Sequence, residues 1–143
     1  CALPIFEKKI SSLNLRASKI SLKYLLPLSD LFINSGYVNR NDIRIGHEET
    51  TEFSIQKYSY DFCIENLKII VEVNSYGFHT KKRDSNWVQA RSGKSSKEIW
   101  DRDMLKKQLA EDSGFSIYYI WEDDPIEIVE EIYENHIRKI RNS

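Results

Sequence analysis

Apolar residues recur along this chain with two periods, one typical of helices and one typical of strands. Residues 18–34 follow the 3.6-residue helical period, and Ser35-Gly36 ends the pattern. The apolar positions of this stretch are Ile20, Tyr24, Leu25, Leu28, Leu31 and Phe32. Because Pro27 lies inside the stretch, the sequence predicts a helix that is kinked or divided in two there.

A β-hairpin is predicted in the middle of the chain. Residues 58–64 alternate in polarity and are rich in strand-forming residues, and Glu65-Asn66 provides turn chemistry. Residues 67–73 are then almost continuously apolar. Strands with this composition are usually buried on both faces, so we expect the second strand of the hairpin to be central in its sheet.

The second half of the chain predicts a helix at residues 97–111, a strand at 115–121 and a helix at 125–140. The expected buried positions are Ile99, Trp100, Met104, Leu105 and Leu109 in the first helix and Ile126, Val129, Ile132, Tyr133, His136 and Ile137 in the second. A strand, helix, strand order makes the strand at 115–121 parallel to the one at 67–73. With a short strand at 43–47, the predicted fold class is an α/β sandwich, in which helices flank a mixed sheet of about four strands.

Composition limits the class of protein. The chain has 143 residues, of which 41% are hydrophobic, so it can bury one core as a single domain. It has neither an apolar run long enough for a membrane span nor a signal-peptide pattern, so we expect a cytoplasmic protein without a membrane partner. Cys1 and Cys63 are too few for a disulfide framework, and a first residue other than Met suggests a fragment of a longer protein. We interpret Cys63, His47 and His136 as structural.

Charge is distributed unevenly, although the net charge is only −1. Residues 75–96 are polar and longer than an ordinary connection, so the segment is either functional or disordered. Cationic residues are concentrated there and just beyond, at Lys81, Lys82, Arg83, Arg91, Lys94 and Lys97. Acidic residues instead accumulate towards the end of the chain. A nucleic-acid-binding face needs local rather than total positive charge, so DNA remains a candidate partner.

The hairpin carries the candidate chemistry. Asp61 opens one strand and Val73-Asn74 end its partner, so the three residues are expected at one end of the sheet. A carboxylate and a backbone carbonyl there suit Mg²⁺, which can neutralise a phosphodiester and activate water. His79 follows across a glycine-containing loop and can transfer protons, and Asp103 can orient its imidazole.

Each of these residues also has a plainer interpretation. Asp61 can be a turn or capping residue, His79 an ordinary loop histidine and Asp103 a solvated helix position. Glu72 is harder to explain in this way, because a carboxylate within an apolar run needs a partner or a function.

A family resemblance rests on several short matches between residues 60 and 122. They are Tyr60-Asp61-Phe62, the apolar strand through Val71, Val73-Asn74-Ser75-Tyr76-Gly77-Phe78-His79, Arg102-Asp103, Leu105 with Leu109, Gly114-Phe115 and Ile120-Trp121-Glu122. In these the chain resembles the catalytic core of very short patch repair (Vsr) endonucleases. It is also similar to the phage homing endonucleases named for a Glu-Asp-x-His-Asp motif. Both belong to the PD-(D/E)xK nuclease superfamily.

The resemblance implies a role for each matching residue. Asp61 and the backbone carbonyl of Val73 would bind Mg²⁺ or Mn²⁺, His79 would be the acid/base residue and Asp103 its partner. Asn74 stands where the repair enzymes have a second histidine, so we do not expect this chain to have the contribution of that histidine.

Three departures from the family pattern affect these expectations. Glu72-Val73-Asn74 resembles the E-x-K element with asparagine in place of lysine, so a lysine-activated water is not expected. The family's early glutamate is missing from residues 18–25. The carboxylates that can replace it are Glu48, Glu49 and Glu52. The cysteines and histidines of the repair enzymes' structural zinc site are missing too, so we expect no zinc.

The resemblance also gives the basic segment after His79 a function. Its cations and Trp87 would contact the phosphates and bases of double-stranded DNA, although a solvated loop remains the alternative. We therefore expect a Mg²⁺-dependent DNA endonuclease of homing or mismatch-repair type. Its expected catalytic residues are Asp61, His79, Asp103, Glu72 and Asn74. Its sequence specificity is expected to come from a separate DNA-binding region. The alternative is a DNA-binding or assembly module that has kept this fold and lost catalysis. A phosphatase of another fold is disfavoured because the chain has no phosphate-binding glycine loop.

Overall fold

The computed structural model describes residues 19–46, 53–55, 58–74 and 96–143. Its helices are α2 (Lys19–Asn34), α3 (Ser96–Asp112) and α4 (Ile128–Arg141), with short 3₁₀ turns η1 (Arg40–Asp42) and η2 (Glu65–Leu67). The strands are β1 (Ile43–Ile45), β2 (Phe53–Ile55), β3 (Tyr58–Tyr60), β4 (Phe62–Ile64), β5 (Ile69–Asn74) and β6 (Ser116–Trp121). The predicted α/β class is therefore confirmed.

The main sheet has four strands in the order β1-β4-β5-β6. β4 is antiparallel to β1 and to β5, whereas β5 and β6 are parallel and are connected through α3. The sheet is therefore mixed, as the sequence predicts. β5 has a neighbour on each side and all six of its residues are buried, which explains its continuous apolar sequence.

Residues 58–64 form two strands and not the single strand that their alternation predicts. The chain bends at Asp61, so that β3 pairs with β2 in a separate two-stranded ribbon while β4 enters the main sheet. Gly46 packs against this bend and donates its N–H to the carbonyl of Asp61. A Cβ at Gly46 would lie 2.8 Å from the backbone oxygen of Tyr60, so the close approach requires glycine.

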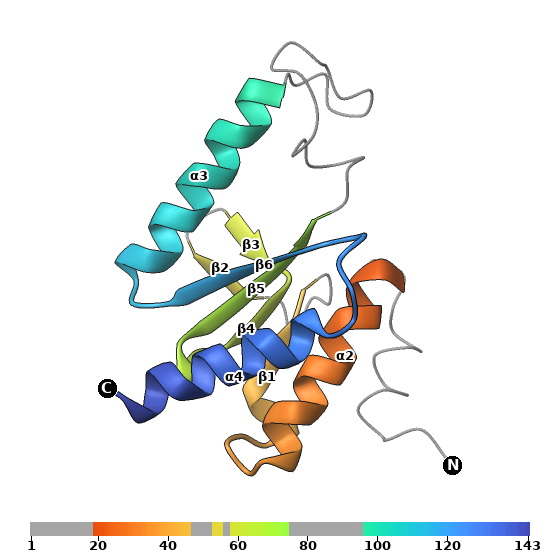
Figure 1. Cartoon of the computed structure of the whole chain (residues 1–143). Coiled ribbons are helices and arrows are strands. Elements are labelled where there is room, and N and C mark those ends of the chain that lie inside the picture. The colour runs from red at the N-terminus through yellow and green to blue at the C-terminus, as the bar shows by residue number, and fades with distance from the viewer. Residues whose placement is uncertain (1–18, 47–52, 56–57, 75–95) are drawn as a thin grey trace.

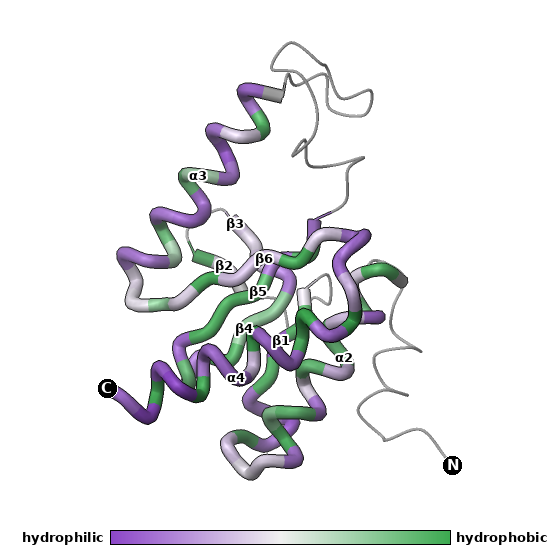
Figure 2. Tube along the Cα trace, in the orientation of Figure 1, coloured by the Kyte–Doolittle hydropathy of each residue, from purple (hydrophilic) through white to green (hydrophobic). Residues whose placement is uncertain are grey.

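The two faces of the main sheet are covered by different elements. Ile69, Val71 and Val73 of β5 pack in one cluster with residues of α2 and α4. Ile70 packs on the opposite face with Ala110 of α3. Figure 1 shows α3 and the β2–β3 ribbon on one side of the sheet and α2 and α4 on the other. In Figure 2, β4 and β5 are mostly hydrophobic, whereas α3 is mostly hydrophilic.

Helix α2 continues through Pro27 and is not divided. Proline removes one backbone hydrogen bond, to the carbonyl four residues earlier. That carbonyl belongs to Lys23, an exposed residue, so water can take the place of the missing donor. At the end of α2, Gly36 has a φ of +81°, which agrees with the predicted stop. The buried side includes Leu22, which the sequence analysis missed, whereas Ile20 is exposed.

The buried side of α3 differs from the prediction. Met104 and Leu105 are 65% and 47% exposed, whereas Ile99, Lys106 and Ala110 are buried. These three residues lie seven and four positions apart, on one side of a helix. The sheet-facing side of α3 therefore carries a charged residue that an apolar pattern cannot identify.

The remaining elements follow the sequence closely. α4 begins at Ile128 and not at Pro125, and Ile126 is exposed, but its other expected core positions are buried or partly buried. His136 and Cys63 are buried, as expected for structural residues. Within the described part of the chain, no helix is long and apolar enough to cross a bilayer.

Candidate functional site

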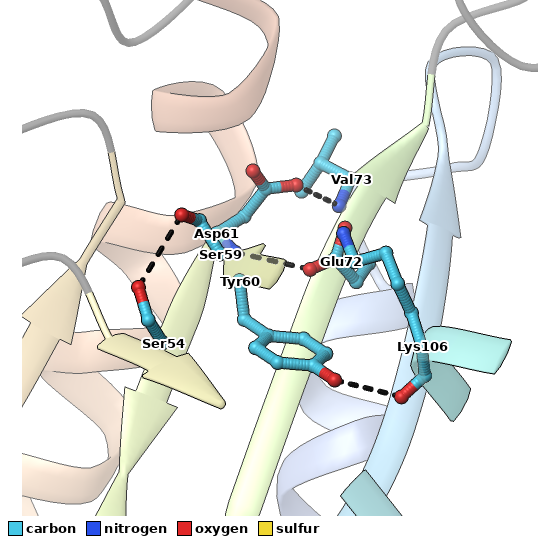
Figure 3. A network of polar contacts seen from close by, with 7 residues as sticks. All are labelled: Ser54, Ser59, Tyr60, Asp61, Glu72, Val73 and Lys106. Atoms are coloured by element: carbon cyan, nitrogen blue, oxygen red, sulfur yellow. Dashed lines mark hydrogen bonds and ion pairs between the residues drawn. The ribbon is translucent and has the colours of Figure 1, made fainter. Parts of the chain in front are cut away.

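Polar side chains converge at the carboxyl end of β5, on the side of the sheet that α3 covers. The group consists of Asp61 at the bend, Glu72 on β5, Lys106 on α3 and Tyr60 at the end of β3 (Figure 3). Glu72 faces α3 because it lies two residues beyond Ile70, and alternate residues of a strand share a face. Residues from β3, β5, α3 and the bend between β3 and β4 thus form one site.

Asp61 fills a gap in the hydrogen bonding of the sheet. Because the chain bends there, β4 has no further residues to pair with the end of β5. The Val73 N–H instead donates to Asp61 Oδ2 at 2.9 Å, and the Asp61 N–H donates to Glu72 Oε1 at 3.2 Å. The carboxylate of Asp61 therefore caps a strand end, as its plainer interpretation predicts.

Glu72 forms a buried ion pair with a residue that is 34 positions away. Lys106 Nζ lies 3.3 Å from Glu72 Oε2, and both side chains are about 90% buried or more. Tyr60 donates its hydroxyl hydrogen to the backbone carbonyl of Lys106 at 2.7 Å, and its ring centroid lies 5.0 Å from the ammonium. These contacts fix α3 against the bend at Asp61.

The site concentrates negative charge in a region of low polarity. Burial, followed by the charge of Asp61, raises the pKa of Glu72 above its usual range, while Lys106 acts in the opposite direction. Burial followed by the charge of Glu72 raises the pKa of Tyr60 to about 12. The pKa of Tyr119, beside Glu72 on β6, is also raised, by burial and then by Glu72 and Asp103. In each case the second cause of the pKa shift is a neighbouring negative charge, which a cation would offset.

Asn74 ends β5 on the same face as Glu72. It is 4% exposed, and its backbone carbonyl accepts a hydrogen bond from the Glu122 N–H at 3.0 Å. Its side-chain oxygen, Oδ1, is buried without a hydrogen-bond partner in the described part of the structure. Such orphaned buried acceptors are uncommon.

The structure brings together only part of the predicted site. Asp61, Glu72, Val73 and Asn74 meet at the end of β5, and Asp103 is partly buried on α3, three residues before Lys106. Lys97, predicted to contact DNA, is exposed in the first turn of α3, where its ammonium lies 3.6 Å from Asp101. Several predicted site residues lie outside the described residues: His79, Lys81, Lys82, Arg83, Trp87, Arg91 and Lys94, as do the replacement carboxylates Glu48, Glu49 and Glu52.

The sequence pattern does not predict Lys106, Tyr60 or Tyr119 as site residues. A signal for Lys106 exists in its spacing, because it follows Asp103 by three residues and precedes Ala110 by four, on one helical side. Apolar periodicity does not reveal this spacing, because Asp103 and Lys106 are charged. Tyr60 and Tyr119 are typical strand residues, and only the strand pairing places them beside the carboxylates.

The donor atoms at this site are of the kind that Mg²⁺ prefers. Asp61 and Glu72 offer carboxylate oxygens, and Mg²⁺ commonly binds one or two carboxylates while keeping several waters. Burial is the main cause of the raised pKa of Glu72, and repulsion by Asp61 is the second cause, which a bound cation would relieve. Among the described residues, no group of three or more histidine, cysteine or carboxylate side chains is placed so that it could hold a metal ion by itself.

Comparisons with protein-family models, with curated proteins and with solved structures give no match to this chain. The function is therefore inferred from the geometry of the site.

Proposed function

We propose that this protein is a Mg²⁺-dependent endonuclease of the PD-(D/E)xK type that hydrolyses phosphodiester bonds in double-stranded DNA. The observation that carries the proposal is the placement of the Asp61 and Glu72 carboxylates at the end of β5, with the Lys106 ammonium against Glu72. Charges buried at a strand end are costly for stability and are typical of functional sites.

Asp61 and the Val73 carbonyl would hold Mg²⁺ or Mn²⁺, with Glu72 as a further carboxylate. When bound, the ion supplies positive charge to the phosphate and lowers the pKa of a bound water. Lys106 supplies the ammonium that is missing from the E-x-K position, where this chain has Asn74. It approaches Glu72 from α3, so a lysine can act at this site despite the asparagine.

His79 is proposed as the acid/base residue, with Asp103 as the group that orients its imidazole. Asp103 lies on the sheet-facing side of α3, and its charge reaches Tyr119 beside Glu72, which supports a place near the reacting phosphate. The basic residues after His79 are proposed to contact the DNA backbone, with Trp87 placed against the bases. Binding would then be steeply salt-dependent.

A cleavage assay tests the proposal directly. The purified chain is incubated with supercoiled plasmid and with labelled duplex DNA in Mg²⁺, in Mn²⁺ and in EDTA. We expect cleavage only with metal, and a loss of about 100-fold or more in Asp61→Asn, Glu72→Gln, Lys106→Met and His79→Ala. Glu134→Gln, the same chemical change at an exposed position of α4, is the matched control and should keep full activity. Full activity in both Asp61→Asn and His79→Ala would exclude this mechanism.

A DNA-binding module without catalysis is the second candidate, and one observation favours it. Helix α2 contains no glutamate, the residue that the resemblance leads one to expect there. This candidate predicts a DNA mobility shift in EDTA that is lost when the basic residues after His79 are changed to glutamate, and no cleavage products in Mg²⁺ or Mn²⁺. The two assays together separate the candidates.

A further inference from the structure

The side chain of Asn74 is the least satisfied polar group near the carboxylates. Its Oδ1 is buried and has no hydrogen-bond donor among the described residues, and the residue as a whole is 4% exposed. Leaving a buried acceptor unpaired costs about 1–3 kcal/mol. An amide at this position therefore needs an explanation other than its own hydrogen bonding.

A structural role at the strand end does not supply that explanation. The backbone carbonyl of Asn74 already accepts the Glu122 N–H, a bond that any residue at this position can make. Val73, on the opposite face, belongs to the apolar cluster with α2 and α4. An apolar side chain at position 74 would therefore complete β5 at lower cost than the asparagine does.

The position of Asn74 relates it to the carboxylates. It lies two residues beyond Glu72 on the face that α3 covers, roughly 7 Å along the strand. The preceding residue, Val73, donates its N–H to Asp61. Asn74 therefore directly follows the residue that contacts the Asp61 carboxylate. Its side-chain oxygen Oδ1 needs a partner that is a cation or a hydrogen-bond donor. Amide oxygens are common ligands of hard divalent cations and poor ligands of thiophilic ones.

We propose that Asn74 Oδ1 is a ligand of the divalent cation, either directly or through one of its waters, so that the ion has a neutral oxygen ligand beside the carboxylates. This inference rests on the proposed function, because it assumes that a cation binds at Asp61 and Glu72. A neutral ligand adds no charge to a site in which the Asp61 charge already raises the proton affinity of Glu72. Asn74 therefore favours Mg²⁺ and Mn²⁺ without increasing the repulsion in the metal-free protein.

Two substitutions with opposite expected effects test this role. Asn74→Leu removes the oxygen at similar size. Its Mn²⁺ affinity should fall about tenfold or more, because the loss of even a hydrogen-bond partner of a metal ligand costs 10–100-fold. The metal-free protein should melt at the same or a higher temperature. Asn74→Asp should bind Mn²⁺ at least as tightly as the wild type and melt at a lower temperature without metal.

The measurements are calorimetric titration of Mn²⁺ without DNA and melting temperatures with and without Mg²⁺. Asn135→Leu, at an exposed position of α4, is the matched control and should change neither. If Asp61→Asn abolishes Mn²⁺ binding while Asn74→Leu keeps wild-type affinity, the role of Asn74 is wrong and the proposed metal site stands. If Asn74→Leu lowers the melting temperature and leaves the affinity unchanged, the asparagine is structural. If the wild-type chain binds no Mn²⁺, both proposals fail.

Discussion

The two faces of β5 differ in chemistry although they are built from alternate residues of one strand. On the side of α2 and α4, Ile69, Val71 and Val73 continue a single apolar cluster to the end of the strand. On the side of α3, the sequence changes from Ile70 to Glu72 and then to Asn74. Because successive residues point to opposite faces, one strand can stabilise the fold on one side and present polar groups on the other.

The polar groups at the end of the α3 face reduce the stability of the fold. A buried ion pair rarely contributes more than apolar residues of the same size would, because both charges lose their hydration. Here Glu72 and Lys106 are buried together, and an unpaired amide oxygen lies beside them. The opposite face has a continuous apolar core. The contrast indicates that the α3 face is arranged for something other than stability.

The largest effect is expected from the apolar face. Phe62 is fully buried in the cluster with α2 and α4, so Phe62→Ala should cost about 3–5 kcal/mol of unfolding free energy. Leu105→Ala on the outer side of α3 should change it by less than about 0.5 kcal/mol. Urea denaturation followed by circular dichroism measures both. A large loss from Leu105→Ala would mean that α3 buries the side that its apolar pattern predicts.

A smaller loss is expected when the ion pair on the α3 face is broken. Lys106→Met leaves the buried Glu72 carboxylate without its cation and should cost about 3 kcal/mol near neutral pH, limited by uptake of a proton. The double variant Glu72→Leu/Lys106→Met should be as stable as the wild type or more so, while losing any metal binding. Chemical denaturation and Mn²⁺ titration of the three proteins test this. A double variant clearly less stable than the wild type would show that the pair itself stabilises the fold.

The same contrast between the two faces explains how much of the fold and of the candidate site the sequence predicts. The apolar face gives periodic patterns, and these predict β5, β6, α2 and α4, together with the parallel pairing and the mixed sheet. The α3 face gives no such pattern at its polar end. Lys106 reads as a solvated helix residue, and only the packing of α3 on the sheet places its ammonium against Glu72.

The break between β3 and β4 was unpredictable for a different reason. Residues 58–64 are rich in strand-forming residues throughout, so local propensity favours one strand. The bend depends on a distant residue, Gly46, whose backbone occupies the space beside Tyr60 and Asp61. The sequence therefore does not show that one strand ends and a second sheet begins at Asp61.

Gly46 therefore offers an intermediate test, because it holds the polar site without belonging to it. Gly46→Ala would place a Cβ 2.8 Å from the Tyr60 backbone oxygen and 3.0 Å from the Asp61 Cα. We expect a loss of about 2 kcal/mol, as for overpacked cores, together with weaker Mn²⁺ binding as Asp61 shifts. Ser59→Ala, exposed on β3, is the control and should change neither quantity appreciably. Unchanged Mn²⁺ affinity in Gly46→Ala would mean that the bend does not position the Asp61 carboxylate.

The smallest effect concerns His136, which is buried on the α4 side of the sheet. Its Nε2 lies 2.7 Å from the Leu67 carbonyl and its Nδ1 lies 3.1 Å from the Tyr118 hydroxyl. A neutral ring satisfies both contacts, with Nε2–H donating to the carbonyl and Nδ1 accepting from the hydroxyl. Burial is the main reason that the pKa of His136 is lowered from the usual 6.5.

The sign of the pH dependence follows from that shift. Well above pH 6.5 the histidine is neutral in both the folded and the unfolded chain, and its contribution to stability is constant. As the pH falls below 6.5, the unfolded chain takes up a proton before the folded one does, so stability decreases until the lower pKa of the folded state is passed. The stability of wild type should therefore fall between about pH 7.5 and about pH 5.5 more steeply than that of His136→Gln, which keeps a donor for Leu67 and does not titrate. Urea denaturation at the two pH values measures the unfolding free energy of both proteins. If it falls by the same amount in wild type and in His136→Gln, the acid sensitivity belongs to other groups. The apolar face would then contain no titrating residue that affects folding.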